Sequence, residues 1–124
     1  MDSKQTVMVV DDSQDVRELV ALQLRLSGYE VVEARDGREA VELAKEKRPA
    51  LIVMDMQMPV MDGLAATRAI RQIDGLCGIP IIAFSAFGTR YHLPAIEAGC
   101  DEYVSKDSGL FHLMGIVRQY LPPA

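Results

Sequence analysis

The sequence predicts an α/β fold, a doubly wound sheet of five parallel strands with five helices. Short apolar runs rich in β-branched residues alternate with longer amphipathic stretches. The runs are apolar at consecutive positions, which is typical of parallel strands covered on both faces. The chain has 124 residues, the length of one compact domain, and shows no internal repeat, low-complexity tract or linker. This alternation predicts a single domain with right-handed crossovers.

Five apolar runs mark the strands. They cover residues 7–10, 31–32, 51–54, 81–84 and 103–104. The first helix is predicted at about 13–27, because Val16, Leu19 and Val20 share a face that would point inward. Gly28 follows as its stop signal.

The other helices show a similar spacing of apolar residues. The apolar face of the second helix consists of Ala40, Val41 and Ala44, and that of the third consists of Ala66, Ala69, Ile70 and Ile73. The apolar face of the fifth helix consists of Leu110, Leu113, Met114, Val117 and Leu121. Asp107 or Ser108 can cap the last helix, and prolines 122 and 123 end it. The fourth helix, before Gly99, contains Pro94, so it must begin late enough to place this proline in its first turn.

Composition limits the classes of function. The net charge of −5 disfavours a large basic face for nucleic acid. No apolar run approaches the roughly 18 residues needed to span a membrane, and residues 1–6 lack a secretory pattern. We therefore expect a cytoplasmic protein that binds neither membrane nor nucleic acid directly. Cys77 and Cys100 form no C-x-x-C pair and have no metal-ligand spacing, so both are expected to be reduced and mostly buried.

Polar side chains follow four of the apolar runs. Asp11 and Asp12 follow the first, Asp55 the third, Ser85 the fourth and, after one more residue, Lys106 the fifth. Because ligands of open parallel sheets bind beyond the carboxyl ends of the strands, these side chains are expected to converge at one edge. In the strand order 2-1-3-4-5 the first and third strands lie about 4.8 Å apart, which crowds the three carboxylates together. Such carboxylates need a counter-charge, and oxygen-only ligands favour Mg²⁺, with Lys106 as a second positive charge.

These residues lie in segments that resemble the response-regulator receiver family of two-component signalling systems. The segments are Val9-Val10-Asp11-Asp12-Ser13, residues 54–63 (MDMQMPVMDG), Ser85-Ala86, Gly99-Cys100-Asp101-Glu102-Tyr103 and Ser105-Lys106. The resemblance covers nearly the whole chain. It implies a flavodoxin-like receiver fold with strand order 2-1-3-4-5, formed by residues 5–122 with no output domain.

The resemblance also implies a function. The protein would be a signalling switch, and not a turnover enzyme, that accepts a phosphoryl group from a sensor histidine kinase or a histidine phosphotransfer protein. It would assist its own phosphorylation and dephosphorylation, and would control a downstream protein partner.

Each site residue receives a role from the same resemblance. Asp55 is implied as the phosphoacceptor, and Lys106 as the lysine that pairs with it or with its phosphate. Ser85 and Tyr103 are implied as the switch residues. The implied cofactor is Mg²⁺, held by Asp11, Asp12, Asp55 and the main-chain carbonyl of Gln57. The residue types agree, since a carboxylate can form a covalent phosphoryl intermediate while positive charges stabilise the transferring group.

Three other functions remain open. A flavin-binding electron carrier would need a Ser/Thr/Gly-rich phosphate cradle after the first strand, where the acidic residues 11–15 would repel a phosphate. A Mg²⁺-dependent aspartyl phosphatase would need a substrate cap and an acid where Gln57 stands. A receiver-like scaffold without phosphorylation would not need the full set of acidic, hydroxyl and lysine residues.

Several residues also have simpler interpretations. Asp12 or Ser13 could act only as a helix cap. Four methionines lie close together in the sequence, at Met54, Met56, Met58 and Met61. We expect them to pack in the core and not to bind a soft metal. His92 and His112 are expected to be surface or packing residues.

Three positions depart from the family pattern or flank the site. Asp107 follows Lys106, where the family often has a proline with a cis bond. Gln57 and Phe87 flank the predicted site, and we expect the ring of Phe87 to shield an acyl phosphate from water and so prolong its lifetime.

Overall fold

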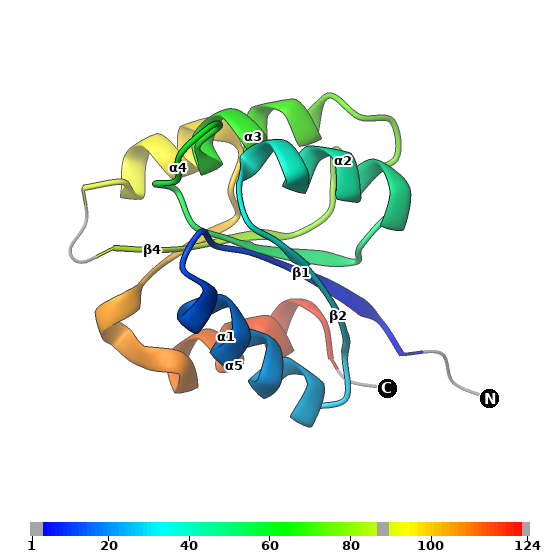
Figure 1. Ribbon diagram of the computed structural model, residues 1–124, viewed down its shortest axis with the longest axis vertical. Helices are drawn as coiled ribbons and strands as arrows, with labels where there is room; N and C mark the ends of the chain where they lie inside the picture. Colours follow the sequence, from blue (N-terminus) through cyan, green and yellow to red (C-terminus); the bar gives the residue numbers. More distant parts are fainter. Residues whose placement is uncertain (1–3, 87–89, 123–124) are drawn as a thin grey trace.

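Strands and helices alternate along the chain in the computed structural model, which describes residues 4–86 and 90–122 (Figure 1). The strands are β1 (Thr6–Val10), β2 (Glu30–Ala34), β3 (Leu51–Met54), β4 (Ile81–Ser85) and β5 (Glu102–Ser105). The helices are α1 (Gln14–Leu26), α2 (Gly37–Lys47), α3 (Gly63–Arg71), α4 (His92–Ala98) and α5 (Gly109–Tyr120), with a short 3-10 helix, η1 (Lys106–Ser108), before α5. Every predicted strand and helix is present in this part of the chain. No helix within it is long and apolar enough to cross a membrane.

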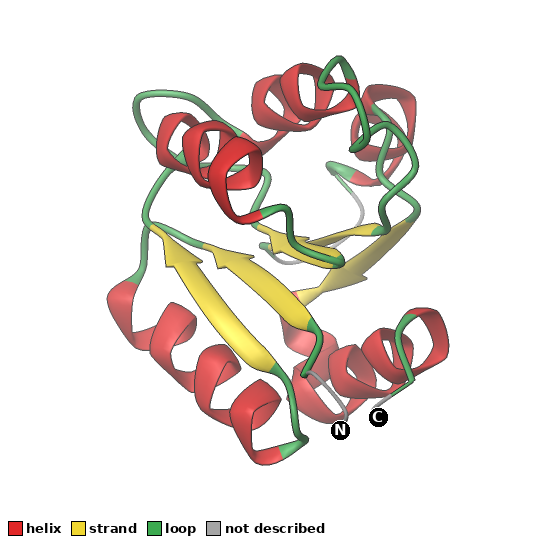
Figure 2. Ribbon diagram, turned by 90° about the vertical axis from the view of Figure 1, so that its right-hand side faces the viewer, coloured by secondary structure: helices red, strands yellow, loops and turns green. Residues whose placement is uncertain are grey.

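The strands form one parallel sheet in the order β2-β1-β3-β4-β5, which confirms the predicted fold and strand order. Helices α1 and α5 cover one face of the sheet, and α2, α3 and α4 cover the other (Figures 1 and 2). Val10 of β1 pairs with Met54 of β3. The next residues, Asp11 and Asp55, therefore leave neighbouring strands side by side.

The sheet is buried on both faces, which explains the continuous apolar runs in the sequence. In β1, Val7 and Val9 pack toward the α1 and α5 layer, whereas Met8 and Val10 pack toward the opposite layer. Each large apolar side chain buried in this way stabilises the fold by about 1.5–3 kcal/mol. The ends of the strands are then the places where polar side chains gather.

Side chains cap three of the helices, and the predicted helix-end signals Gly28 and Pro94 are confirmed. Ser13, Asp36 and Asp62 cap α1, α2 and α3, and each accepts a hydrogen bond from the main-chain N–H three residues later, at 3.4, 2.9 and 2.9 Å. Gly28 follows α1 with φ of +99°, the left-handed conformation that favours glycine. Pro94 is the third residue of α4, inside the first turn.

Two burial predictions are wrong. The side chain of Leu19 is 50% exposed, because Val20, Ala21 and Leu24 form the buried stripe of α1 and Leu19 lies at its edge. Cys77 is exposed in the segment between α3 and β4, whereas Cys100 is buried as expected.

The predicted cap of α5 is also wrong. Ser108 stands at the N-cap position but makes no side-chain cap hydrogen bond. The Asp107 carboxylate instead accepts a hydrogen bond from the Ser105 hydroxyl. The chain enters α5 through η1, and Asp107 lies within η1 and not at the N-cap of the helix. No peptide bond in the described residues is cis, including the one between Lys106 and Asp107.

Candidate functional site

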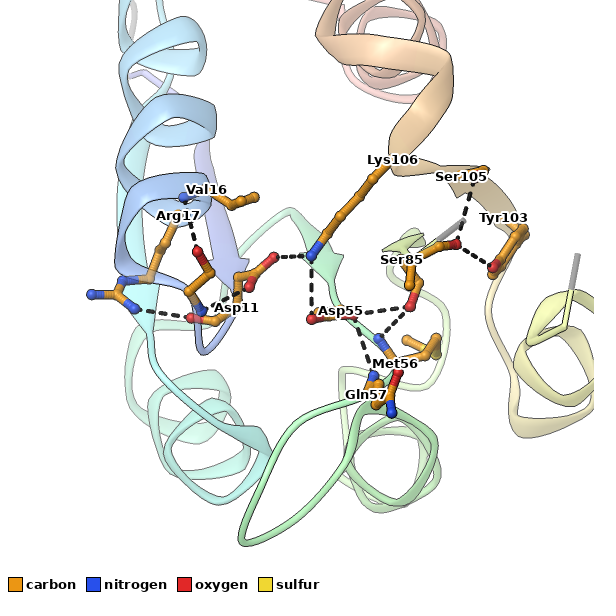
Figure 3. A network of polar contacts seen from close by, with 12 residues as sticks. Asp11, Val16, Arg17, Asp55, Met56, Gln57, Ser85, Tyr103, Ser105 and Lys106 are labelled. Atoms are coloured by element: carbon orange, nitrogen blue, oxygen red, sulfur yellow. Dashed lines mark hydrogen bonds and ion pairs between the residues drawn. The ribbon is translucent and has the colours of Figure 1, made fainter. Parts of the chain in front are cut away.

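The carboxyl ends of four strands bring polar side chains to one edge of the sheet (Figure 3). Asp11 follows β1, Asp55 follows β3, Ser85 is the last residue of β4, and Lys106 follows β5. One carboxylate oxygen from each of Asp11, Asp12 and Asp55 lies within 4.8 Å of the other two. The structure thus brings together the acidic, hydroxyl and lysine side chains that were predicted at this edge.

Asp55 is the centre of this group and is only 5% exposed. Its Oδ1 accepts hydrogen bonds from the Ser85 hydroxyl at 2.9 Å and from the main-chain N–H of Gln57 at 3.2 Å. Its Oδ2 lies 3.4 Å from Nζ of Lys106. The hydroxyl of Ser85 also accepts the N–H of Met56 at 3.3 Å, so the fully buried Ser85 ties the end of β4 to the residues after β3.

Lys106 bridges the two buried carboxylates. Its Nζ lies 2.8 Å from Oδ2 of Asp11 and 3.4 Å from Oδ2 of Asp55. Burial lowers the pKa of Lys106, but the hydrogen bond to Asp11 and the nearby negative charges outweigh burial and raise the pKa above its ordinary value. Lys106 is therefore charged at neutral pH.

The charge of Asp55 is only partly compensated. Burial raises the pKa of the Asp55 carboxyl above its ordinary value, and the charge of Asp11 adds to this effect. The ammonium of Lys106 and the hydrogen bonds from Gln57 and Ser85 lower the pKa by less. Three carboxylates thus face one ammonium at this edge of the sheet.

Asp11 and Asp12 lie in the turn between β1 and α1, with Asp11 buried and Asp12 exposed. The N–H of Asp11 donates to the Ala34 carbonyl at 3.2 Å, and its Oδ1 accepts the N–H of Ser13 at 2.9 Å. Ser13 caps α1, so the interpretation of Asp12 as a helix cap is wrong. The carboxylate of Asp12 is instead available to bind a ligand at the edge of the sheet.

The donor atoms of this site suit a hard divalent cation. All three cluster members are carboxylates, and no histidine or cysteine joins them among the described residues. Oxygen ligands of this kind favour Mg²⁺ over softer metals. The residues of the site therefore fit Mg²⁺.

The methionines near the site have a packing role, as predicted. Met54, Met56 and Met58 are buried.

Two predictions about the surroundings of Asp55 stay untested. The side chain of Gln57 is exposed, and its main-chain N–H binds Asp55, but a role of its carbonyl as a metal ligand stays a prediction. Phe87, expected to shield the phosphoryl group, lies outside the described residues.

Tyr103 lies beside the chain that continues from Ser85. Its hydroxyl donates to the carbonyl of Ala86 at 3.4 Å, and the Ser105 hydroxyl donates to the same oxygen at 3.5 Å. The ring of His92 stacks on Tyr103 with centroids 5.3 Å apart and an interplanar angle of 12°. Burial raises the pKa of Tyr103, so its hydroxyl stays protonated. His92 is thus a packing residue, as expected, although its partner could not be predicted.

Two glycines allow the segment that follows Asp55 to pack closely against neighbouring main chain, and neither was predicted to support the site. A Cβ on Gly63 would lie 2.0 Å from the carbonyl oxygen of Asp55, and one on Gly37 would lie 2.3 Å from the carbonyl oxygen of Met61. The N–H of Gly37 donates to that same Met61 oxygen at 2.9 Å. The Asp-Gly pairs at 36–37 and 62–63 were the signal available in the sequence, because glycine allows a close approach of the main chain.

Comparison with known proteins identifies the family. A family model described as the response regulator receiver domain matches residues 7–118. The polar-differentiation response regulator DivK of Brucella anthropi is 37% identical over 120 residues, which cover 96% of this chain and 98% of that protein. DivK of Brucella ovis is 35% identical over 120 residues with the same coverage of both chains.

Solved structures agree. Chemotaxis protein CheY4 of Vibrio cholerae superimposes with a TM-score of 0.89 at 29% identity, covering 96% of this chain and 100% of that chain. The receiver domain of a sensor histidine kinase from Pseudomonas aeruginosa PAO1 superimposes with a TM-score of 0.88 at 31% identity, covering 95% and 98%, and it holds a magnesium ion coordinated in its active site cleft. These matches favour a receiver over a flavin carrier or an aspartyl phosphatase. The chain belongs to the response regulator receiver family of two-component signalling systems.

Proposed function

We propose that this receiver domain accepts a phosphoryl group on Asp55 in a Mg²⁺-dependent reaction and thereby controls a protein partner. The main support is the buried position of Asp55, with Ser85 on one oxygen and Lys106 near the other. The domain would act as a signalling switch that assists its own phosphorylation and dephosphorylation. It would not turn over a separate metabolite.

Asp55 would act as the nucleophile. A carboxylate oxygen attacks the phosphorus of a phosphohistidine donor, an O–P bond forms as the P–N bond breaks, and the imidazole leaves with the electron pair. Lys106 and the hydroxyl of Ser85 lie beside the two oxygens of Asp55 and can contact the incoming phosphoryl oxygens.

The proposed Mg²⁺ ligands are the carboxylates of Asp11, Asp12 and Asp55 and the carbonyl of Gln57. When bound, the ion would neutralise negative charge on the phosphoryl oxygens. The cluster of three carboxylates supports this assignment, as does the magnesium ion in the receiver from Pseudomonas aeruginosa.

The proposed donor is a sensor histidine kinase or a histidine phosphotransfer protein, and residues 5–122 would act as one receiver domain. The family match over residues 7–118 and the similarity to DivK support both statements. The cytoplasmic location stays a prediction.

Treatment with acetyl phosphate and Mg²⁺, followed by intact mass measurement, tests the proposal. We expect one phosphoryl group per chain, located on the peptide that contains Asp55, and none after EDTA removes the metal. No mass increase in the presence of Mg²⁺, or labelling mapped to a different residue, would contradict the proposal.

Asp12→Ala is expected to remove most Mg²⁺ binding. An ion that binds only the folded state raises the free energy of unfolding by about 2.7 kcal/mol at a concentration of 100 times its Kd. Thermal melts across a Mg²⁺ titration should show this gain in the wild type and little of it in Asp12→Ala. Asp15→Ala, which removes an exposed carboxylate of α1 outside the acidic cluster, is the control and should keep the gain. An undiminished gain in Asp12→Ala would refute its role as a ligand.

Ser85→Ala is expected to uncouple phosphorylation from Tyr103. The Ser85 hydroxyl binds Asp55, and the Tyr103 hydroxyl binds the carbonyl of Ala86, the next residue in the chain. A phosphoryl group would give Ser85 a new acceptor and so shift the environment of Tyr103. NMR signals of Tyr103 should respond to phosphorylation in the wild type and much less in Ser85→Ala. An equal response in both proteins would exclude this coupling.

A further inference from the structure

We propose that Arg17 is a positioning residue, which orients Asp12 for Mg²⁺ by holding the main-chain carbonyl of Asp11. This inference rests on the proposed function and adds a residue to its metal site. Nη1 of Arg17 donates to the Asp11 carbonyl at 2.9 Å, and Nε donates to Oε1 of Glu33 at 3.2 Å (Figure 3 shows the first of these bonds). The side chain of Arg17 is only 11% exposed, and both contacts are partly buried.

The carbonyl of Asp11 matters because it belongs to the peptide plane that carries Asp12. In a trans peptide the carbonyl of one residue and the N and Cα of the next are coplanar. The N–H of Asp11 donates to the Ala34 carbonyl at 3.2 Å, and Oδ1 of Asp11 accepts the N–H of Ser13 at 2.9 Å. Those bonds fix Asp11 itself. The bond from Arg17 fixes the following plane, and with it the direction from which the exposed side chain of Asp12 leaves the chain.

Glu33 keeps the guanidinium in place. Glu33 lies on β2, which pairs with β1, and its Oε2 lies 3.5 Å from Nη2 of Arg25. A guanidinium has its donors in a rigid planar fork, so Arg17 can bind a carbonyl and a carboxylate at once. The carboxylate also compensates a mostly buried positive charge that would otherwise stand beside a cation site.

Positioning and simple electrostatics predict opposite effects on Mg²⁺ affinity. Removing the charge of Arg17 leaves Glu33 less compensated and makes the surroundings of the acidic cluster more negative, which alone would tighten cation binding. Loss of a group that orients metal ligands instead weakens metal affinity, typically by 10–100-fold. The sign of the change therefore separates the two roles.

Calorimetric titration of the whole chain with Mg²⁺ tests the proposal on Arg17→Met and Arg17→Lys. We expect Mg²⁺ binding at least about tenfold weaker in both variants. Lysine keeps the charge that pairs with Glu33, so this variant is expected to fold, but a single ammonium cannot reproduce the planar fork.

Arg71→Met is the matched control for damage to the fold. The side chain of Arg71 is 15% exposed and donates to the carbonyls of Gly99 and Ile79, both at 2.7 Å. These residues precede β5 and β4, at the amino ends of the strands and away from the acidic cluster. Arg71→Met should lower the stability of the protein and leave the Mg²⁺ affinity unchanged.

Each outcome decides the matter. Unchanged or tighter Mg²⁺ binding in the Arg17 variants would overturn the positioning role while leaving the proposed metal site intact. Equal weakening in Arg71→Met would also overturn it, because general damage to the fold would then explain the loss. Absence of Mg²⁺ binding by the wild type would overturn the proposed site, and this inference with it.

Discussion

Asp55→Asn is expected to abolish phosphorylation by acetyl phosphate in the presence of Mg²⁺. An amide lacks the nucleophilic carboxylate that an acyl phosphate requires. The neighbouring carboxylates are poor substitutes, because Ser85 and Lys106 lie beside the two oxygens of Asp55 and would stabilise a phosphoryl group on that residue. Intact mass measurement should show the phosphoryl increase in the wild type and none in the variant.

The control for this experiment is Asp15→Asn, which removes an exposed carboxylate from the first turn of α1. It should be phosphorylated like the wild type. Persistent labelling of Asp55→Asn would assign the acceptor to another residue. Loss of labelling in Asp15→Asn would show that a general change of charge, and not the loss of Asp55, prevents the reaction.

The same Asp55 variant also bears on pH and stability. Burial raises the pKa of the Asp55 carboxyl, and Lys106 and two hydrogen bonds reverse only part of this. A carboxyl whose pKa is raised on folding contributes stability that is fully present below its unfolded pKa and is lost as pH rises through the folded pKa. The ionised group therefore opposes folding of the metal-free protein at neutral pH.

Urea unfolding in EDTA measures this effect. Asp55→Asn should be at least as stable as the wild type at neutral pH, and the difference should shrink as pH falls toward the raised pKa of Asp55. Lower stability of the variant at neutral pH would mean that pairing with Lys106 outweighs the burial of the charge. The urea curves also show whether both proteins are folded under the conditions of the labelling experiment.

The residues of the candidate site could be predicted because they depend on topology. Once the strands and their order are known, whatever follows β1, β3, β4 and β5 must meet at one edge of the sheet. Asp11, Asp55, Ser85 and Lys106 are found there for that reason. The continuous apolar runs were equally informative, because both faces of a parallel sheet are covered.

Contacts between residues far apart in the sequence could not be predicted in the same way. The bond from Arg17 to Glu33 depends on how α1 crosses β2, and the stack of His92 on Tyr103 depends on where α4 begins. Helical periodicity assigns a face only broadly. It therefore placed Leu19 inward, although this residue lies half exposed at the edge of the buried stripe of α1.

Gly63→Ala is expected to destabilise the protein by roughly 3 kcal/mol, at the upper end for an added methyl group in a packed site. Gly63 is the first residue of α3, and its N–H donates to the carbonyl of Met56 at 3.1 Å. A Cβ at this position would lie 2.0 Å from the carbonyl oxygen of Asp55 and 2.8 Å from Cα of Met56. Both are main-chain atoms, so the methyl group must push α3 away from the sheet or displace Asp55.

Gly115→Ala makes the same chemical change where the structure has room. Gly115 is exposed within α5, and no atom beyond the adjoining turns of the helix lies within 4 Å of the position that a Cβ would take. Alanine is favoured over glycine inside a helix by about 0.5–1 kcal/mol, so this variant should be more stable than the wild type in urea. Gly63→Ala should also bind Mg²⁺ more weakly, because the added methyl group would press on the main chain of Asp55, whereas Gly115→Ala should keep the wild-type affinity. Wild-type stability and Mg²⁺ affinity in Gly63→Ala would show that α3 can retreat from β3 without moving Asp55.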